Sequence, residues 1–212
     1  MSPSRPSGPR GPTGAAPPPP AWLGRTRLPV DVLPAGTVLH RIHRPSLEPL
    51  FFGPGPGIPP THRFDSASGR FGVLYVGLNR AGAVAETLLR NPQRLMVATS
   101  EFMDRAATEL VCRRDLRVVK LYGAGLQAVG TDNAISTGPY EPCGVWSDAF
   151  WDHPDQPDGI AYQSQHDSNE LCLALLERPD MTFAIQSTKP LTGLLHEIAA
   201  LLNAYGKSLS PT

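Results

Sequence analysis

Hydrophobic and polar residues alternate along the first half of the chain in a pattern that predicts two β-strands. The run Thr37–Arg44 alternates apolar with polar positions and is interrupted at Pro45, which has no backbone N–H for strand pairing. Arg41 would point to one face of this strand. A mostly apolar run, Arg70–Val76, is typical of a buried strand, and the Gly- and Pro-rich residues 51–60 between the two runs predict a long loop.

After the second strand the hydrophobic pattern changes to a helical period. Ala81, Val84, Ala85 and Leu88 fall on one side of a helix that would run from Arg80 to Leu89. Asn79 is a suitable N-cap, because its side-chain oxygen can accept a hydrogen bond from the first turn, and Asn91-Pro92 would end the helix. Glu86 is therefore expected near the middle of an otherwise apolar helix.

The rest of the chain mixes short apolar runs with helical segments. Further strands are expected at residues 96–99, 116–121, 159–162, 171–176 (a central strand) and 181–185, and helices at residues 106–110, 144–151 and 191–205. Strands and helices are interspersed without a regular βαβ rhythm, which favours an α+β fold in a single compact domain.

Both ends of the chain differ from its middle in composition. Residues 1–20 hold eight prolines and almost no large apolar side chain, so the sequence predicts a disordered Pro-rich tail over residues 1–21. The polar end predicts a flexible C-terminus over residues 207–212. The folded domain is then expected over residues 22–206.

Composition narrows the classes of function. Hydrophobic residues make up 41% of the chain, and 19 Lys and Arg balance 19 Asp and Glu, so no direct binding to nucleic acid is expected. The three cysteines show no metal-binding spacing, and no metal site is expected. No apolar run reaches the roughly 18 residues of a membrane span, and no apolar signal segment opens the chain, which predicts a cytoplasmic protein without membrane contact.

Familiar catalytic motifs are absent from the sequence. It contains no P-loop, no GxGxxG after a strand, no HExxH and no GxSxG, so the common triphosphatase, dinucleotide-binding, zinc-protease and hydrolase classes are excluded. The remaining candidates for chemistry are Arg41, Arg63, Tyr75, Glu86 and Ser164.

Those candidates occur in an order that resembles the RES-domain family of NAD-degrading toxins. The matching pieces are Leu-His-Arg41-Ile, His-Arg63-Phe64, Val-Leu-Tyr75-Val, Ala83-Val-Ala-Glu86-Thr and Asp158-Gly-Ile-Ala-Tyr-Gln-Ser164, within a match from about Thr37 to Arg178. The family often has Ser-Arg where this chain has Ser164-Gln165. Some members place the serine earlier, where this chain offers Glu141 and Ser147 in the region 140–147, so the position of the serine stays open.

The resemblance implies a fold akin to the ADP-ribosyltransferases and an enzyme that cleaves the nicotinamide–ribose bond of NAD⁺. NAD⁺ would be the substrate and no separate cofactor is implied. Water or inorganic phosphate would be the acceptor, making the enzyme a glycohydrolase or a phosphorylase. The family's role further implies the toxin of a toxin–antitoxin pair, neutralised by a helix-turn-helix, Xre-like antitoxin.

The resemblance also assigns roles to the candidate residues. Glu86, Arg41 and Ser164 would be catalytic, and Arg63 and Tyr75 would bind substrate. A carboxylate stabilises the ribosyl cation that forms as nicotinamide leaves, and arginine forks suit the diphosphate better than lysine. Two alternatives remain: a RES-like module that binds a nucleotide without turnover, favoured by Gln165 in place of arginine, and an ADP-ribosyltransferase that modifies a macromolecule.

Overall fold

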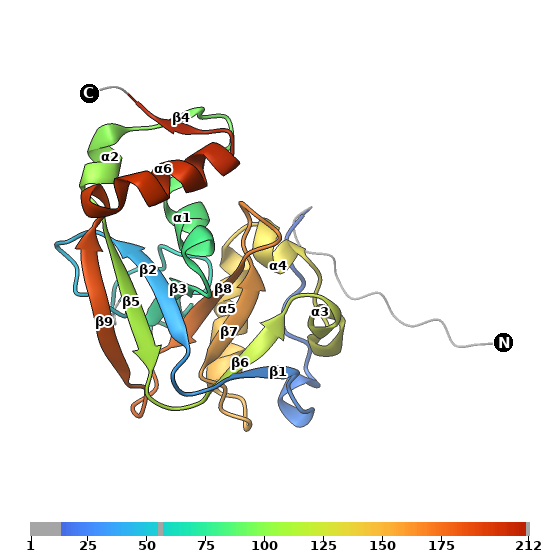
Figure 1. Ribbon diagram of the computed structural model, residues 1–212. Helices are drawn as coiled ribbons and strands as arrows, with labels where there is room; N and C mark the ends of the chain where they lie inside the picture. Colours follow the sequence, from blue (N-terminus) through green and yellow to red (C-terminus); the bar gives the residue numbers. More distant parts are fainter. Residues whose placement is uncertain (1–13, 55–56, 211–212) are drawn as a thin grey trace.

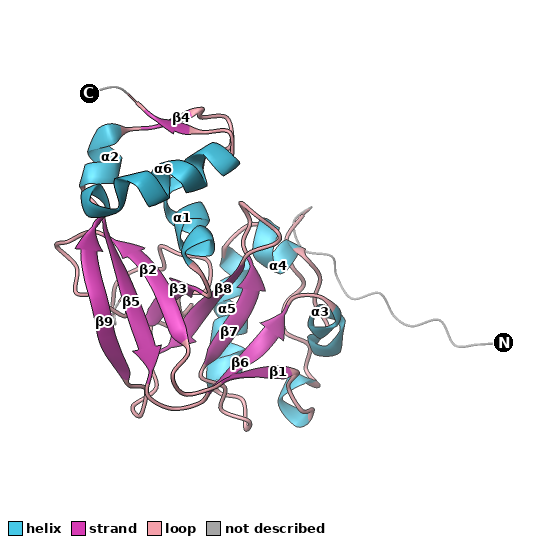
Figure 2. Ribbon diagram, in the orientation of Figure 1, coloured by secondary structure: helices cyan, strands magenta, loops and turns pink. Residues whose placement is uncertain are grey.

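A large mixed sheet forms the centre of the computed structural model, which describes residues 14–54 and 57–210 (Figures 1 and 2). In sheet order its eight strands are β1 (Val30–Leu33), β6 (Leu116–Leu121), β7 (Gly159–Gln163), β8 (Leu171–Leu176), β3 (Val73–Gly77), β2 (Val38–His43), β5 (Ala106–Cys112) and β9 (Phe183–Pro190). Strands β6 and β7 are parallel and the other neighbours are antiparallel. Two short parallel strands, β4 (Met96–Val97) and β10 (Ser208–Leu209), lie apart from it.

The large sheet consists of two halves that are joined weakly. Strands β3 and β8 are paired at five residues and β2 and β5 at six, but β2 and β3 are paired only at His40 and Gly77. We call β1, β6, β7, β8 and β3 the β8 half, and β2, β5 and β9 the β5 half. The two halves separate at the boundary between β2 and β3.

Helices cover the two halves separately. They are α1 (Arg80–Leu88), α2 (Thr99–Met103), α3 (Ala124–Val129), α4 (Ala134–Thr137), α5 (Glu141–Trp151) and α6 (Leu195–Ala204), with short 3₁₀ turns at η1 (Leu23–Arg25) and η2 (Leu191–Leu194). Helices α3, α4 and α5 pack against the β8 half, where Trp146 and Phe150 of α5 are fully buried. Helices α1, α2 and α6 form a second core with Ile42 of β2 and Ala107 of β5.

A third core lies on the sheet face opposite to α5. Leu39 and Leu110 from the β5 half meet Leu74 and Leu173 from the β8 half there. Loop side chains such as Phe52 pack against this cluster. Hydrophobic contact on this face therefore joins the two halves although few backbone hydrogen bonds do.

The pattern of hydrophobic residues predicted most of these elements. The expected strands over Thr37–Arg44, Arg70–Val76, residues 116–121 and residues 159–162 correspond to β2, β3, β6 and β7, and the run over residues 171–176 is the central strand β8. The helix expected from Arg80 forms as α1, and the Asn79 side chain accepts a hydrogen bond from the Gly82 N–H at 2.8 Å. The α+β class and the single compact domain are confirmed.

Residues 106–110 were expected to be helical, and this prediction is wrong. The segment is the start of β5, which pairs with β2 on one side and β9 on the other. Locally, a helix and a strand are both compatible with Ala106, Ala107 and Leu110. Pairing with β2 and β9 stabilises the strand. The strand expected at residues 96–99 is also shorter, because Thr99 begins α2.

The expectation of a disordered N-terminal tail is wrong for the part of it that the structure describes. Ala16 is buried in the core beside α5, and the Trp146 indole N–H donates to the Pro17 carbonyl oxygen at 2.8 Å. Residues 1–13 lie outside the described residues. Composition missed the contact because proline carbonyls and small side chains can dock on an aromatic surface without burying a large side chain of their own.

The flexible C-terminus expected over residues 207–212 is likewise corrected for residues 207–210. Ser208 and Leu209 form β10 against β4, and the Thr99 N–H donates to the Ser210 hydroxyl at 3.1 Å. Residues 211–212 lie outside the described residues. The end of the chain is thus fixed by backbone pairing, which its polar composition does not reveal.

Candidate functional site

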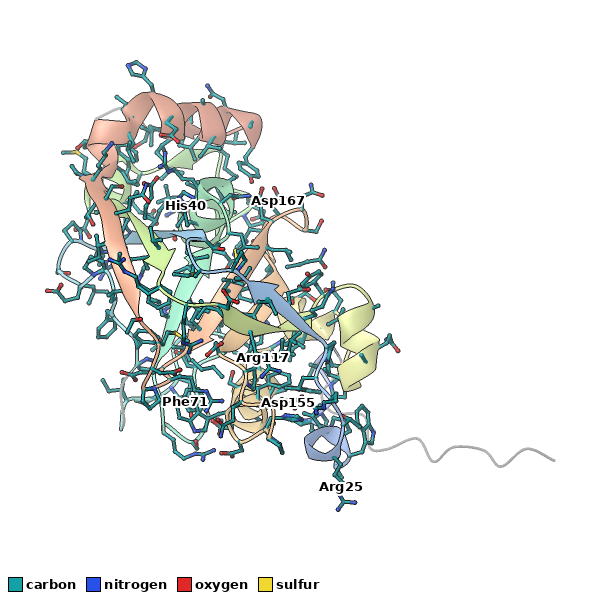
Figure 3. All side chains as sticks on the ribbon, turned by 60° about the horizontal axis from the view of Figure 1, so that its bottom comes forward. Arg25, His40, Phe71, Arg117, Asp155 and Asp167 are labelled. Carbon is teal, nitrogen blue, oxygen red and sulfur yellow. The ribbon has the colours of Figure 1, made fainter. Side chains whose placement is uncertain are left out.

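A cavity of about 610 Å³ opens where β2 and β3 separate. Its wall is formed by residues of β2 and β3, one side of α1, and the loop before β3, together with residues that follow β7. Figure 3 shows His40, a lining residue, toward the same end of the domain as Asp167, whereas Phe71 and Arg117 lie toward the opposite end. Four of the five candidate residues, Arg41, Arg63, Tyr75 and Glu86, line this cavity.

Glu86 projects from α1 and is bound by the hydroxyl of Ser164. The Ser164 Oγ donates to the Glu86 Oε1 at 2.6 Å, and it accepts from the backbone N–H groups of His166 and Asp167 at 3.1 and 3.4 Å. Among the described residues, Glu86 forms no ion pair and its Oε2 accepts no hydrogen bond. One oxygen of the Glu86 carboxylate, Oε1, is therefore fixed by Ser164, and the other, Oε2, is left for a ligand.

Local structure explains how two residues so distant in sequence meet. Strand β3 turns sharply into α1 at Gly77, where a Cβ would lie 2.7 Å from the Ala83 nitrogen, so only glycine fits. Strand β7 ends at Gln163, directly before Ser164. Because β3 and β7 both pair with β8, the segments that follow them emerge close together.

Arg41 lies on β2 and is anchored by the loop that follows it. Its Nη1 donates to the carbonyl oxygens of Pro49 and Phe51 at 2.7 and 3.1 Å. Burial lowers the pKa of Arg41 to about 10, and no described carboxylate pairs with it. A partly desolvated cation without an acidic partner favours an anionic ligand in the cavity.

Arg63 is buried and bound on one side by the α4–α5 region. Its Nη1 donates to the Gly138 carbonyl oxygen at 2.7 Å, and its Nη2 donates to the Gln165 Oε1 at 2.7 Å. The guanidinium carbon lies 4.5 Å from the centre of the Tyr140 ring. Gln165, which follows Ser164 in the chain, thus orients Arg63 beside Ser164.

Tyr75 lines the cavity with its ring, because its hydroxyl is fully used by the protein. The hydroxyl donates to Asp65 Oδ1 at 2.9 Å and accepts from the Phe64 N–H at 2.9 Å. Burial, and next the charge of Asp65, raise the pKa of Tyr75 well above its ordinary value. The His62 ring packs edge-on against Tyr75 at 5.2 Å between centroids.

Asp65 is a site residue that the sequence reasoning missed. It is fully buried, and its Oδ2 accepts from the Thr61 and His62 N–H groups at 2.8 and 2.7 Å. Together with the Tyr75 bond, these contacts hold the loop that carries Arg63 against β3. The available signal was its position two residues after Arg63, in a polar loop with no other acid nearby.

Two histidines in the cavity were also missed. Burial is the main cause that lowers the pKa values of His62 and His166, and the charge of Glu86 opposes the shift in both. Arg90, which follows the end of α1, also lines the cavity. The cavity wall thus carries neutral imidazoles and several arginines beside the Glu86 carboxylate.

The alternative candidates for the serine site, Glu141 and Ser147 in the region 140–147, make contacts away from Glu86. The Ser147 hydroxyl is fully buried in α5 and donates to the Phe64 carbonyl oxygen at 2.7 Å. Glu141 is exposed in the first turn of the same helix. Neither residue lines the cavity, whereas Ser164 contacts Glu86.

The described part of the chain offers neither a metal site nor a membrane-spanning helix. Within residues 14–54 and 57–210, no group of three or more His, Cys, Asp or Glu side chains is arranged to hold a metal ion. In the same part of the chain, no helix has the length and apolar character needed to cross a bilayer.

Comparison with known proteins gives one family and one fold. A family model described as the RES domain matches residues 38–192. A chain in the crystal structure of the M. tuberculosis MbcT–MbcA toxin–antitoxin complex superimposes with a TM-score of 0.60 at 15% identity, covering 79% of this chain and 90% of that one. No curated protein sequence matches.

Proposed function

The chain belongs to the RES-domain family, and from this premise we propose that it is an enzyme that cleaves the nicotinamide–ribose bond of NAD⁺. The observation that carries the proposal is the Glu86 carboxylate, bound by Ser164 at 2.6 Å in a cavity of about 610 Å³, with no cation from the described part of the chain paired to it. A cavity of this size is in the range of small-molecule sites, roughly 300–1,000 Å³. The arginines on its wall suit the negatively charged diphosphate of a dinucleotide.

Glu86 would act on the sugar. When the bond between the ribose C1′ and the nicotinamide nitrogen breaks, the electron pair leaves with nicotinamide and the ribose becomes an oxocarbenium-like cation. A carboxylate fixed nearby stabilises that charge, and such preorganised groups contribute about 100- to 1,000-fold in rate. We assign this role to the Glu86 Oε2, since Oε1 accepts from Ser164.

Ser164 would orient this carboxylate. Two backbone N–H groups hold its oxygen, so its single proton is directed to Glu86. Because an oriented carboxylate loses no rotational freedom when the substrate binds, the hydroxyl contributes through positioning.

Arg41 and Arg63 would bind the diphosphate. Each guanidinium uses part of its donors on protein acceptors and is thereby fixed in orientation, with the remaining N–H groups left for phosphate oxygens. Arginine forks bind phosphate in a bidentate way. Arg90 adds a further positive charge on the same cavity.

Nicotinamide release tests the reaction. Purified protein is incubated with NAD⁺ in buffers with and without inorganic phosphate, and the products are separated by chromatography. Hydrolysis would add water at C1′ and yield ADP-ribose with one proton, and phosphorolysis would yield ADP-ribose 1″-phosphate. Absence of nicotinamide under both conditions, with NAD⁺ binding retained, would favour the alternative of a binding module.

We further propose that the protein is the toxin of a toxin–antitoxin pair with a helix-turn-helix, Xre-like antitoxin as its partner. The family assignment and the likeness to a chain of a toxin–antitoxin complex support this role. The product of an adjacent gene, co-expressed with the chain, should copurify with it and suppress nicotinamide release. Growth arrest that E86Q does not relieve would contradict a toxic role through this site.

A further inference from the structure

We propose that the Tyr162 hydroxyl is a substrate-binding group that donates a hydrogen bond to a ribose hydroxyl beside the scissile bond. The inference rests on the proposed function and identifies which sugar feature the cavity recognises. It adds Tyr162 to the substrate-binding residues, among which the sequence analysis expected Tyr75.

Tyr162 belongs to the part of the cavity that contains Glu86 and Ser164. It lies on β7 two residues before Ser164, and residues two apart in an extended chain point to the same side. Its partner on β8 is Cys172, which also lines the cavity. The ring is held in the core by Phe64, with 4.9 Å between centroids.

The hydroxyl of Tyr162 has no protein partner in the described part of the chain, although the side chain is only 5% exposed. Tyr75 differs, because its hydroxyl both donates and accepts within the protein. A buried phenol normally finds a hydrogen-bond partner, since an unpaired one is costly. Because Tyr162 lines the cavity, a ligand there can supply the missing acceptor.

Burial, together with the charge of Glu86, keeps the proton of Tyr162 in place. Burial, and next the charge of Glu86, raise the pKa of Tyr162 well above its ordinary value, and Arg63 and Arg90 only partly oppose this. At neutral pH the phenol is therefore a donor and never a phenolate. The cavity thus holds a donor, Tyr162, near an acceptor, Glu86.

A donor and an acceptor that serve the same small region match an alcohol better than a phosphate, whose ionised oxygens only accept hydrogen bonds. An alcohol oxygen accepts one hydrogen bond and donates another. The ribose next to the scissile bond carries such hydroxyls at C2′ and C3′. Glu86 would accept from one of them and Tyr162 would donate to the same or the neighbouring oxygen.

Y162F tests the inference, with Y122F as a matched control. Tyr122 lies at the end of β6, where its hydroxyl donates to Asp31 away from the cavity. We expect Y162F to lower kcat/KM for NAD⁺ about tenfold, the scale of one lost hydrogen bond, and to leave the melting temperature unchanged. Y122F should leave kcat/KM unchanged.

Substrate analogues give the decisive measurement. NAD⁺ analogues that lack the 2′- or the 3′-hydroxyl on the nicotinamide ribose are compared in the unsubstituted protein and in Y162F. With one of the two analogues the penalty of Y162F should disappear, because the oxygen that Tyr162 bonds is already missing. A structural role would give the same penalty with every substrate.

Each other outcome counts against the inference. An unchanged kcat/KM in Y162F, or a penalty equal for NAD⁺ and both analogues, overturns it while NAD⁺ cleavage by the unsubstituted protein still stands. Unfolding of Y162F overturns it as well, because the hydroxyl would then have a protein partner. If the unsubstituted protein neither binds nor cleaves NAD⁺, the proposed function fails first and this inference with it.

Discussion

The two halves of the sheet differ in how their side chains are packed. In the β8 half, Leu173 and Leu175 of the central strand are fully buried, and α5 covers the opposite face. In the β5 half, the edge strand β9 is largely exposed, and side chains of β2, β5 and β9 form polar chains such as His43 to Thr108 to Thr188, at 2.8 Å for each step.

This difference in packing affects how firmly the candidate catalytic residues are held in place. Ser164 follows directly on β7 of the well-packed β8 half, whereas Arg41 belongs to the β5 half. Glu86 lies between them on α1, which follows β3 and packs against Ile42 of β2 and Ala107 of β5. A group that must be fixed to within a fraction of an ångström is best supported by dense packing. Arg80 ties the halves together, since it begins α1 and its guanidinium reaches Glu109 of β5 at 2.8 Å.

The largest expected effect is on stability, and it contrasts the two halves directly. L173A in β8 removes a fully buried side chain and should lower the free energy of unfolding by about 2–5 kcal/mol. I185A in β9 trims a side chain that is 51% exposed and should cost about 0.5 kcal/mol or less. Urea unfolding of both variants checks the contrast, and equal losses would remove it.

Conservative replacement of the two arginines compares the two sides of the cavity. R41K and R63K keep the charge but lose the planar fork, so each should weaken NAD⁺ binding by about 1–3 kcal/mol. Calorimetry in an E86Q background avoids turnover. Binding as tight as that of E86Q alone in both variants would place the diphosphate elsewhere.

Removal of residues 1–20 tests how far the packing of the β8 half extends. The deletion takes away Ala16 and the Pro17 carbonyl that accepts from Trp146. We expect a loss of about 1–2 kcal/mol in stability, near the lower range for an unpaired donor, because the indole regains contact with water. An unchanged melting temperature would show that this docking contributes nothing.

The smallest expected effect is the pH dependence of the β5 half. Burial is the main cause that lowers the pKa of His43; Arg41 also lowers it, and the backbone of Arg44 and Leu47 and the charge of Glu48 oppose the shift. The unfolded chain therefore takes up the proton first, and stability should be lost as the pH falls through about 6.5 and below. H43Q should reduce this slope in urea titrations at pH 7.5 and 5.5, and an unchanged slope would assign it to other groups.

Much of the fold could be predicted from local patterns. Alternation predicted β2, helical spacing predicted α1, and an apolar run predicted the central position of β8. The failures share a cause, because β5 at residues 106–112, the docked residues 14–20 and β10 are all decided by partners distant in sequence. Local composition carries no information about such partners.

The residues of the candidate site were likewise predictable from the sequence only in part. Arg41, Arg63, Tyr75 and Glu86 could be selected from the sequence and lie on one cavity. The hydrogen bonds of Asp65 depend on side-chain contacts across the sheet. So does the contrast between Tyr75, whose hydroxyl is used, and Tyr162, whose hydroxyl has no partner among the described residues. Residue type alone cannot distinguish these two tyrosines.

The most direct test of the account measures initial rates of nicotinamide release for E86Q and E109Q. Glu86 lines the cavity and, within the described residues, forms no ion pair, whereas Glu109 of the β5 half is paired with Arg80 and accepts from the Ser187 hydroxyl at 3.0 Å. We expect E86Q to lose about 100-fold or more in turnover at an unchanged melting temperature. E109Q should keep its turnover and melt at a lower temperature. Near-normal turnover in E86Q, or an equal loss in both variants, would contradict the assignment of the NAD⁺-cleaving carboxylate to Glu86.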